Sequence, residues 1–220
     1  MKAGSPAAPA VGYHAAHLTN DPARTVLWQV IASHLASWIP PGAHVLEIGA
    51  GYCDWINHVR AARRVAVDVW PEITRYGAPG VEARVLDLSG ELRTLGVGAF
   101  DVVLASNVLE HFDPDTAARV VADVGALLRP GGRVIVIQPN FRHAWRRYFD
   151  DYTHRSVFTD VSLPALLRSC GLTVERVQAR FLPYSMKGAS SFVRPWLVRA
   201  YLRSPVKPMA GQMLVMARKP

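Results

Sequence analysis

The residue types best suited to chemistry occur in the stretch HVLEIGAGYCD, residues 44–54. Gly49 and Gly51 are spaced as in a nucleotide-binding turn, where glycine lets the backbone turn tightly and approach a ligand without an intervening Cβ. A dinucleotide fingerprint would need a third glycine at position 54, which is Asp54. Glu47 and Asp54 would also repel a pyrophosphate placed at the start of the next helix. The stretch therefore favours a ligand with a cationic group and no phosphate.

Further polar side chains follow the next apolar stretches along the chain. Asp68 closes RVAVD, 19 residues after Gly49, while Asp87 lies in RVLDLS and Asn107 follows FDVVLAS. S-adenosylmethionine fits these groups, because it carries an ammonium, a sulfonium and hydroxyl and amine donors. We expect Asp68 to accept from the ribose, Asp87 from the adenine amine with the Leu88 N–H on a ring nitrogen, and Asn107 to contribute to the methionine pocket. For each aspartate taken singly, a helix cap or turn is the alternative.

Short apolar strands alternate with helical stretches through most of the chain. Helical periodicity predicts helices over 23–38, 53–62, 114–128 and 160–171. Apolar or alternating runs predict strands over 43–49, 64–70, 81–89, 100–106, 133–140, 172–181 and 212–219. Asp160 or Ser162 would cap the fourth helix. The alternation predicts an α/β fold built on a doubly wound, mostly parallel sheet, whose strand ends would bring the polar residues to one edge.

Residues 42–140 resemble the class I S-adenosylmethionine-dependent methyltransferases. The resemblance lies in the pieces VLEIGAG, AVD, VLDLS, FDVVLASNVLEHF and LLRPGGRVIVIQP. It implies a Rossmann-like, seven-stranded sheet of order 3-2-1-4-5-7-6 with an antiparallel last strand, and S-adenosyl-L-methionine as cofactor with S-adenosyl-L-homocysteine as product. The expected cofactor-binding residues are those of the turn and the strand exits: Glu47, Gly49, Ala50, Gly51, Asp68, Val69, Asp87, Leu88 and Asn107.

Cys53 departs from the family pattern, which usually has a further glycine at this position. The thiol either touches the cofactor or packs beneath it, and we favour packing because free cysteine is among the most buried residue types. Cys53 and Cys170 are the two cysteines of the chain. They predict neither a disulfide framework nor a cysteine-based metal site. We therefore expect no metal, and a reducing, cytoplasmic setting.

Methyl transfer requires a nucleophile in line with the S–CH₃ bond at ~3 Å. A hydroxyl or ammonium acceptor also needs a base to remove its proton. His111, in NVLEHF, and His154, in DDYTHRSVFT, are the candidate catalytic residues. The alternative for His111 is a loop-organising role, and for His154 a solvated turn before the next helix. The resemblance implies that the irregular segment 141–160 builds the acceptor pocket.

The acceptor is predicted from the composition of that segment, which mixes arginine with aromatic residues: Phe141, Arg142, Trp145, Arg146, Arg147, Tyr148, Phe149, Tyr152 and Arg155. This mixture suits an anionic or ring-bearing small molecule, methylated at oxygen or nitrogen. A sugar, a lipid-linked molecule or a secondary metabolite would fit. An RNA methyltransferase is an alternative, which is disfavoured because there is no RNA-binding module or dense basic run. A catalytically silent, cofactor-binding protein is the other alternative.

Charge and composition set the domain expectations. The chain has 220 residues and a formal net charge of +8, and the basic excess lies in residues 129–220. We expect residues 1–20 to form a mobile arm and 21–220 a single domain, with 141–160 and 183–208 as acceptor-pocket or lid insertions. No apolar run approaches the ~20 residues of a membrane span. The basic amphipathic stretch 191–207 predicts either packing over the fold or contact with a partner or an anionic membrane surface.

Overall fold

The computed structural model describes residues 21–184 and 194–220. The expected N-terminal arm, residues 1–20, lies outside these residues, as does the part of the expected 183–208 insertion that spans 185–193. Among the described residues, no helix is long and apolar enough to span a bilayer.

A seven-stranded sheet forms the centre of the molecule, with the strand order β3-β2-β1-β4-β5-β7-β6. Strands β1 to β5 are parallel neighbours, and β7 runs antiparallel to both β5 and β6. The strands are β1 (His44–Ile48), β2 (Arg63–Asp68), β3 (Val81–Val85), β4 (Phe100–Ser106), β5 (Leu128–Pro139), β6 (Thr173–Pro183) and β7 (Ala210–Arg218). The predicted fold class, strand order and antiparallel last strand are confirmed.

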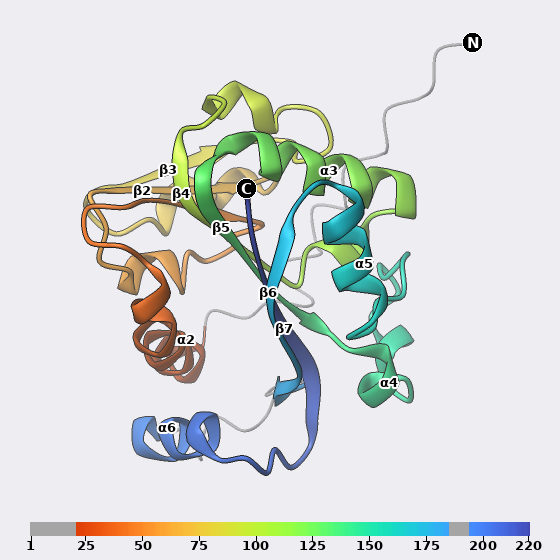
Figure 1. The fold of residues 1–220 in the computed structure, drawn as a ribbon. Coiled ribbons are helices and arrows are strands. Elements are labelled where there is room, and N and C mark those ends of the chain that lie inside the picture. Colours follow the sequence, from red (N-terminus) through yellow and green to blue (C-terminus); the bar gives the residue numbers. More distant parts are fainter. Residues whose placement is uncertain (1–20, 185–193) are drawn as a thin grey trace.

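Helices cover both faces of this sheet (Figure 1). They are α2 (Pro22–Leu35), α3 (Pro114–Leu127), α4 (Phe141–Ala144), α5 (Ser162–Ser169) and α6 (Pro195–Arg203). Helices α2 and α6 lie on one side of the sheet, and α3 and α5 lie on the other. The two long helices begin by the same device. Asp21 caps α2 and Asp113 caps α3, each with its carboxylate accepting a backbone N–H of the first turn and a proline following at the first helical position.

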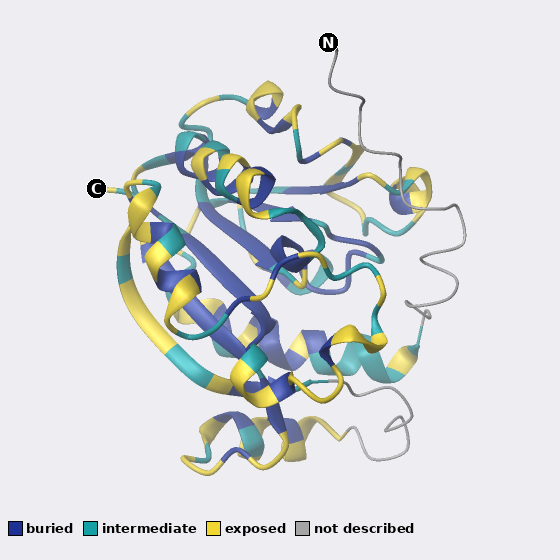
Figure 2. Ribbon diagram, turned by 90° about the vertical axis from the view of Figure 1, so that its right-hand side faces the viewer, coloured by how far each residue is buried: buried dark blue, intermediate teal, exposed yellow. Residues whose placement is uncertain are grey.

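The core consists of two apolar layers, because successive strand residues point to opposite faces. In β1, Leu46 and Ile48 pack with α3 and α5, whereas Val45 packs with α2 and α6. Figure 2 shows the result: the central strands are buried, and the exposed residues lie on the outer sides of the helices, in the loops and along the edge strand β6. Because both sheet faces are covered, polar side chains at the strand ends project from the edge of the sheet.

The predicted helix over 53–62 is wrong. The structure has turns there and a single 3₁₀ turn, η2 (Ile56–His58), after which Val59 is extended. The side chain of Asn57 bonds to the backbone on both sides of a distant loop, donating to the Tyr76 carbonyl at 2.9 Å and accepting from the Ala78 N–H at 2.8 Å. These long-range bonds hold the segment in an irregular path, which local periodicity does not report.

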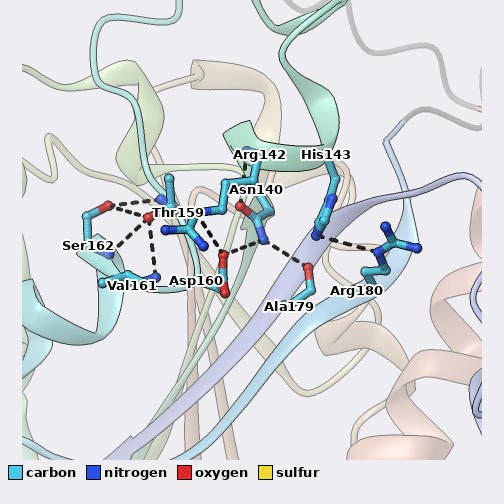
Figure 3. Close-up of polar contacts among 9 residues, drawn as sticks. All are labelled: Asn140, Arg142, His143, Thr159, Asp160, Val161, Ser162, Ala179 and Arg180. Carbon is cyan, nitrogen blue, oxygen red and sulfur yellow. Dashed lines mark hydrogen bonds and ion pairs between the residues drawn. The ribbon is translucent and has the colours of Figure 1, made fainter.

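The predicted caps of α5 are also wrong. The Thr159 hydroxyl accepts from the N–H groups of Val161 and Ser162 at 3.2 and 3.1 Å, and the Ser162 hydroxyl accepts from the Thr159 N–H at 2.9 Å (Figure 3). Asp160 instead accepts from the Asn140 amide at 3.0 Å. The N-cap position is Val161, which makes no side-chain cap bond. The turn before α5 is therefore closed by Thr159 and Ser162, and Asp160 holds the segment that follows β5.

Candidate functional site

Parallel pairing brings the predicted polar residues to one edge of the sheet. Glu47 of β1 is paired in register with Ala66 of β2, and Asp68 of β2 is paired with Val85 of β3. The carboxyl ends of β1, β2, β3 and β4 therefore point toward the same edge. Ligands of open α/β sheets bind at this edge, next to the place where the strand order reverses. In this chain that reversal lies between β1 and β4.

Glu47 is buried just before the glycine turn, with 4% of its surface exposed. One carboxylate oxygen accepts from the Ile56 N–H at 3.0 Å, which fixes the loop that follows the turn. Burial is the main cause that raises the pKa of this carboxyl to about 8; the charges of Asp54 and Asp68 contribute to the rise, and the bond from Ile56 and the charge of Arg24 oppose it. Glu47 therefore lies in an environment that favours a neutral group unless a cation is nearby.

Asp68 connects two backbone segments. Its carboxylate accepts from the Gly51 N–H of the turn and from the Trp70 N–H, both at 2.9 Å. Ala50 is buried, and its N–H donates to the Val67 carbonyl at 3.1 Å. The turn is thus fastened to the end of β2 through main-chain atoms. The aspartate at this position therefore shapes the turn.

Gly49 occupies a position that no other residue fits. Its φ of +65° is in the left-handed region, and an added Cβ would lie 2.4 Å from Cγ2 of Val108. The turn after β1 therefore packs directly against the segment that leaves β4. That segment continues to Glu110 and His111. The contact therefore positions these two residues relative to the glycine turn.

Cys53 also has a left-handed backbone, with φ of 57°. This accounts for the glycine that the family usually places there, since a positive φ is costly for other residues. The thiol is completely buried in the apolar layer that faces α2. Burial first, and the neighbouring carboxyl groups second, raise its pKa to about 12. The favoured interpretation, packing beneath the turn, agrees with this burial.

The remaining predicted cofactor residues lie along the same edge. Asp87 is exposed and accepts from the Ser89 N–H at 2.8 Å, so it forms a local turn as well as ending the third strand region. Leu88 is buried, and Val69 is 37% exposed. Asn107 is exposed with φ of 53°, and its side-chain oxygen accepts from Gln212 at 3.2 Å. Left-handed backbone at a non-glycine residue is concentrated at functional sites.

The carboxyl groups at this edge of the sheet fit S-adenosylmethionine. Asp54 is neutralised by Arg24, whose Nε lies 2.6 Å from its carboxylate, and by a hydroxyl bond from Thr25 at 3.2 Å. Glu47 and Asp68 lie near this ion pair, and the negative charge of Asp68 disfavours the charged form of Glu47. A ligand that brings an ammonium and a sulfonium would relieve this repulsion, whereas a pyrophosphate would add to it.

The two candidate catalytic histidines are brought together. Their ring centroids are 5.0 Å apart, although His111 follows β4 and His154 belongs to the segment after β5. The contact is fixed by backbone bonds, because the N–H groups of Arg155 and Ser156 donate to the Glu110 carbonyl at 2.8 and 3.1 Å. His111 lies at the end of the 3₁₀ turn η5 (Leu109–His111), and both histidines are half-buried.

Hydrogen bonds orient both rings. Nδ1 of His111 lies 2.9 Å from the Thr153 hydroxyl, which donates to Asp151 at 2.6 Å. Nδ1 of His154 lies 2.7 Å from the Tyr148 carbonyl oxygen. Burial acts to raise the pKa of Asp151, but its two bonds from Thr153, and to a smaller extent His111 and His154, outweigh this effect. The net result is a pKa below the usual value. The cluster therefore pairs two imidazoles with an aspartate that remains charged.

Asn140 anchors the segment that carries His154 (Figure 3). It is completely buried, and its amide donates to Asp160 and to the Ala179 carbonyl of β6, both at 3.0 Å. Its side-chain oxygen accepts from the Arg142 N–H at 3.3 Å and thereby begins α4. Both ends of the segment 141–160 are thus tied to one buried amide, which places the segment over the edge of the sheet.

Sequence reasoning missed two further groups. Trp70 stacks on Tyr76 at 5.4 Å, and Tyr52 meets both rings edge-on, which forms an aromatic cluster next to Asp68. Glu110 and Gln138 are completely buried, and their side-chain polar atoms have no hydrogen-bond partner in the described part of the chain. Burial raises the pKa of Glu110 to about 8. The sequence signal for Glu110 is its position next to His111 in NVLEHF, where the prediction considered only the histidine.

The stretch expected to be amphipathic forms α6 where it is described. Val198 and Leu202 are buried toward α2, while Trp196 is 63% and Leu197 is 40% exposed. Lys207 is buried and donates to the carbonyls of Tyr201 and Leu202 at the end of the helix. Its charge therefore caps α6, whereas the basic side chains of Arg194, Arg199 and Arg203 are exposed.

Comparison with known proteins agrees with this geometry. Residues 23–177 match the family model of a methyltransferase domain. A partial relative, the highly reducing polyketide synthase 2 of Gibberella zeae, is 30% identical over 129 residues, which cover 47% of this chain and only 5% of that protein.

Two solved structures show the same fold at low identity. A chain from the complex between the Haloferax volcanii Trm112 methyltransferase activator and the putative methyltransferase superposes with a TM-score of 0.66 at 14% identity, over 88% of this chain and 89% of that one. The N-methyltransferase NodS of Bradyrhizobium japonicum, solved with S-adenosyl-l-homocysteine, gives 0.60 at 16% identity, over 92% and 90%. With the family model matched over more than half of its length, the chain belongs to the S-adenosylmethionine-dependent methyltransferases.

Proposed function

We propose that this chain transfers the methyl group of S-adenosylmethionine to an oxygen or nitrogen atom of a small-molecule acceptor. The observation that carries the proposal is the packing of the carboxylate-lined glycine turn, through Gly49 and Val108, against the segment after β4 that carries His111, whose ring lies 5.0 Å from that of His154. When bound, the cofactor supplies an electrophilic methyl group on a sulfonium. The protein's own task is then to hold the acceptor in line and to manage its proton.

On the cofactor side, each proposed contact uses an acceptor or donor at a strand exit. We assign Glu47 to the ammonium of the methionine end and Asp68 to the ribose hydroxyls. Asp87 would accept from the adenine amine beside the Leu88 N–H, and Asn107 would border the methionine pocket. The close-approaching backbone and the side wall would come from Gly49, Ala50, Gly51 and Val69. The burial of Glu47 supports this, since it raises the pKa of the carboxyl and a bound cation would favour its charged form.

On the acceptor side, His154 or His111 would remove the proton of the attacking hydroxyl or ammonium. Both rings are already oriented through Nδ1, so their Nε2 atoms are the ones that would face an acceptor. A charged Asp151 next to them would stabilise an imidazolium formed in the reaction. Only the geometry of the pair supports this assignment, and turnover measurements on single variants are needed to divide the roles.

The acceptor pocket would be built from the segment 141–160, with 183–208 contributing where it is described. Trp145, Phe149 and Tyr152 are 56%, 61% and 72% exposed, and the neighbouring Arg146 and Arg147 are exposed as well. Such a surface suits an anionic or ring-bearing molecule, for example a sugar, a lipid-linked molecule or a secondary metabolite. The partial match to a polyketide synthase supports a secondary metabolite, and the likeness to an N-methyltransferase is compatible with nitrogen as the target.

The experiment that tests the function is formation of S-adenosylhomocysteine from S-adenosylmethionine with a panel of phenols, sugars and amines. We expect product only in the presence of an acceptor and a matching methylated compound by mass spectrometry. Tight binding of S-adenosylhomocysteine without turnover on any acceptor would favour a silent, cofactor-binding protein instead. Salt-sensitive retention on RNA with methylated nucleotides would favour the RNA methyltransferase.

The exposed face of α6 supports a peripheral contact with an anionic membrane surface. Trp196 and Leu197 lie beside Arg194 and Arg199, all of them exposed, and this pairing of apolar and basic side chains is typical of helices that lie in a membrane interface. Sedimentation with vesicles containing phosphatidylglycerol tests it. We expect binding that Trp196→Ala weakens and that vesicles of phosphatidylcholine alone do not support. Equal sedimentation with both vesicles would contradict it.

A further inference from the structure

We propose that Glu110, His111 and His154 form a binding site for a divalent transition-metal ion. One ligand atom of each side chain lies within 4.8 Å of the other two. Ligand atoms around an ion held at ~2.1 Å are roughly 3–4 Å apart, so a small side-chain adjustment would close the site. Two imidazoles and one carboxylate are a ligand set of Zn²⁺ and related ions that leaves coordination positions open.

The carboxyl group of Glu110 provides an independent reason to expect a cation. The side chain has no exposed surface, and within residues 21–184 and 194–220 neither of its oxygens has a hydrogen-bond partner. Buried polar groups in native proteins are nearly always partnered, because leaving them unpaired costs free energy. One oxygen of this carboxyl lies within 4.8 Å of a ring nitrogen of each histidine, and an ion bound among them would supply the missing partner.

The hydrogen bonds behind the rings select the tautomer that a metal requires. The Thr153 hydroxyl donates to Asp151, so it can only accept from Nδ1 of His111. The Tyr148 carbonyl is an acceptor, so Nδ1 of His154 donates to it. In both neutral rings the lone pair is therefore on Nε2, as inferred from the hydrogen-bond network. Metal-binding histidines are commonly oriented in this way, with the second nitrogen donating to a carbonyl or an oxygen acceptor.

The metal site goes beyond methyl transfer and does not depend on it, because the ligand set consists of the chain's own side chains. An ion here would offer an open position to an acceptor oxygen or nitrogen and lower the pKa of a coordinated hydroxyl. A nitrogen that binds an ion cannot also take a proton. In the ion-bound protein the two histidines would therefore be ligands, and coordination would replace the base.

The test is a titration of the metal-stripped, full-length chain with Co²⁺, followed by visible absorption, and with Zn²⁺, followed by calorimetry. We expect one high-affinity ion per chain. Glu110→Gln and His154→Ala each remove a ligand, so at least tenfold weaker binding is expected for both. Thr153→Val removes the acceptor behind His111, and binding should weaken about 10- to 100-fold at unchanged stoichiometry.

Two controls separate this site from other histidines. His143 lies in the same segment, but its ring contacts Arg180 at 3.5 Å (Figure 3), so His143→Ala should bind Co²⁺ like the wild type. A double variant of His14 and His17 removes the N-terminal histidines and should also have no effect. Thermal unfolding checks that each variant folds. If Glu110→Gln does not fold, His154→Ala still tests the site, because His154 is only half-buried.

The proposal is overturned if the wild-type chain binds no Co²⁺, or if Glu110→Gln and His154→Ala bind it as tightly as the wild type. Neither S-adenosylmethionine nor an acceptor is present in these titrations. A metal-binding chain that transfers no methyl group would therefore refute only the proposed function, and a methyltransferase that binds no ion would refute only the metal site.

Discussion

The two sides of the site are built by different means. The proposed cofactor side is centred on one short stretch, the turn after β1, which Asp68 fastens to the end of β2, with polar side chains at the neighbouring strand exits. The proposed acceptor side is made of side chains from two distant segments, with His111 from the segment after β4 and His154 from the segment after β5. One is specified locally and the other by long-range packing. Variants should therefore separate them, with binding lost on one side and turnover on the other.

The largest expected effect is on the acceptor side. His154→Ala should lower the turnover number by about 10²–10⁴-fold, the range that general acid–base or ligand groups typically contribute. The affinity for S-adenosylhomocysteine should be unchanged, because this ring is oriented by Tyr148 and His111 and lies on the proposed acceptor side. Steady-state kinetics with calorimetry measure both quantities. Equal losses of affinity and turnover would show that the two sides are not separable.

Asp68→Ala is the counterpart on the cofactor side. It leaves the Gly51 and Trp70 N–H groups without their acceptor and removes the proposed ribose contact. We expect roughly 10- to 100-fold weaker binding of S-adenosylhomocysteine in calorimetry. Glu82→Ala is the matched control, because Glu82 is an exposed carboxylate of β3 that pairs with Arg63. Similar losses in the two variants would argue against a role for Asp68 in the cofactor site.

Gly49→Ala tests the contact that joins the two sides. The added Cβ would meet Val108 at 2.4 Å and would sit at a φ of +65°, so the free energy of unfolding should fall by about 2–3 kcal/mol. Urea unfolding measures the loss. Adding Val108→Ala should recover part of it, because the steric overlap is relieved while the backbone strain remains. No recovery would mean that the turn and the β4 segment are not coupled through this pair.

The smallest expected effect is the pH dependence of cofactor binding through Glu47. Burial raises the pKa of this carboxyl to about 8 in the unliganded chain, and a bound ammonium would lower it, so binding releases a proton. Affinity for S-adenosylhomocysteine should rise up to about tenfold per pH unit below pH 8 and level off above it. Calorimetry between pH 6.5 and 8.5 should show this slope, and Glu47→Gln should remove it. If the slope persists in Glu47→Gln, the pH dependence of binding comes from another group.

The raised pKa of Glu47 affects folding stability in the opposite direction: affinity should rise with pH, whereas stability should fall. The folded chain holds the Glu47 proton up to a higher pH than the unfolded chain, whose pKa is near 4.5. Between about 4.5 and 8 the folded state binds more protons, so the contribution of Glu47 to stability is present at low pH and is lost as pH rises. This contribution should disappear in Glu47→Gln, and thermal unfolding over that pH window can measure it.

Much of the fold could be predicted from local patterns. The apolar strands, the turn after β1 and the caps of α2 and α3 depend on neighbouring residues, and the strand order followed from resemblance. The errors occurred where distant atoms decide the local path. Asn57 bonds to the loop at Tyr76 and Ala78, and this replaced the predicted helix over 53–62. Asn140 recruits Asp160, which the sequence had offered as a helix cap.

The sequence by itself determined the cofactor side, because spacing along one strand and one turn suffices to place Glu47 and Gly49 at a sheet edge. It also supplied His111 and His154 as separate candidates. Only the tertiary structure decided that they meet, that a buried Glu110 joins them and that Thr153 and Tyr148 orient their rings. The physical reason is that backbone periodicity is a short-range property, whereas the directions of buried polar side chains follow from which distant donors and acceptors packing brings into reach.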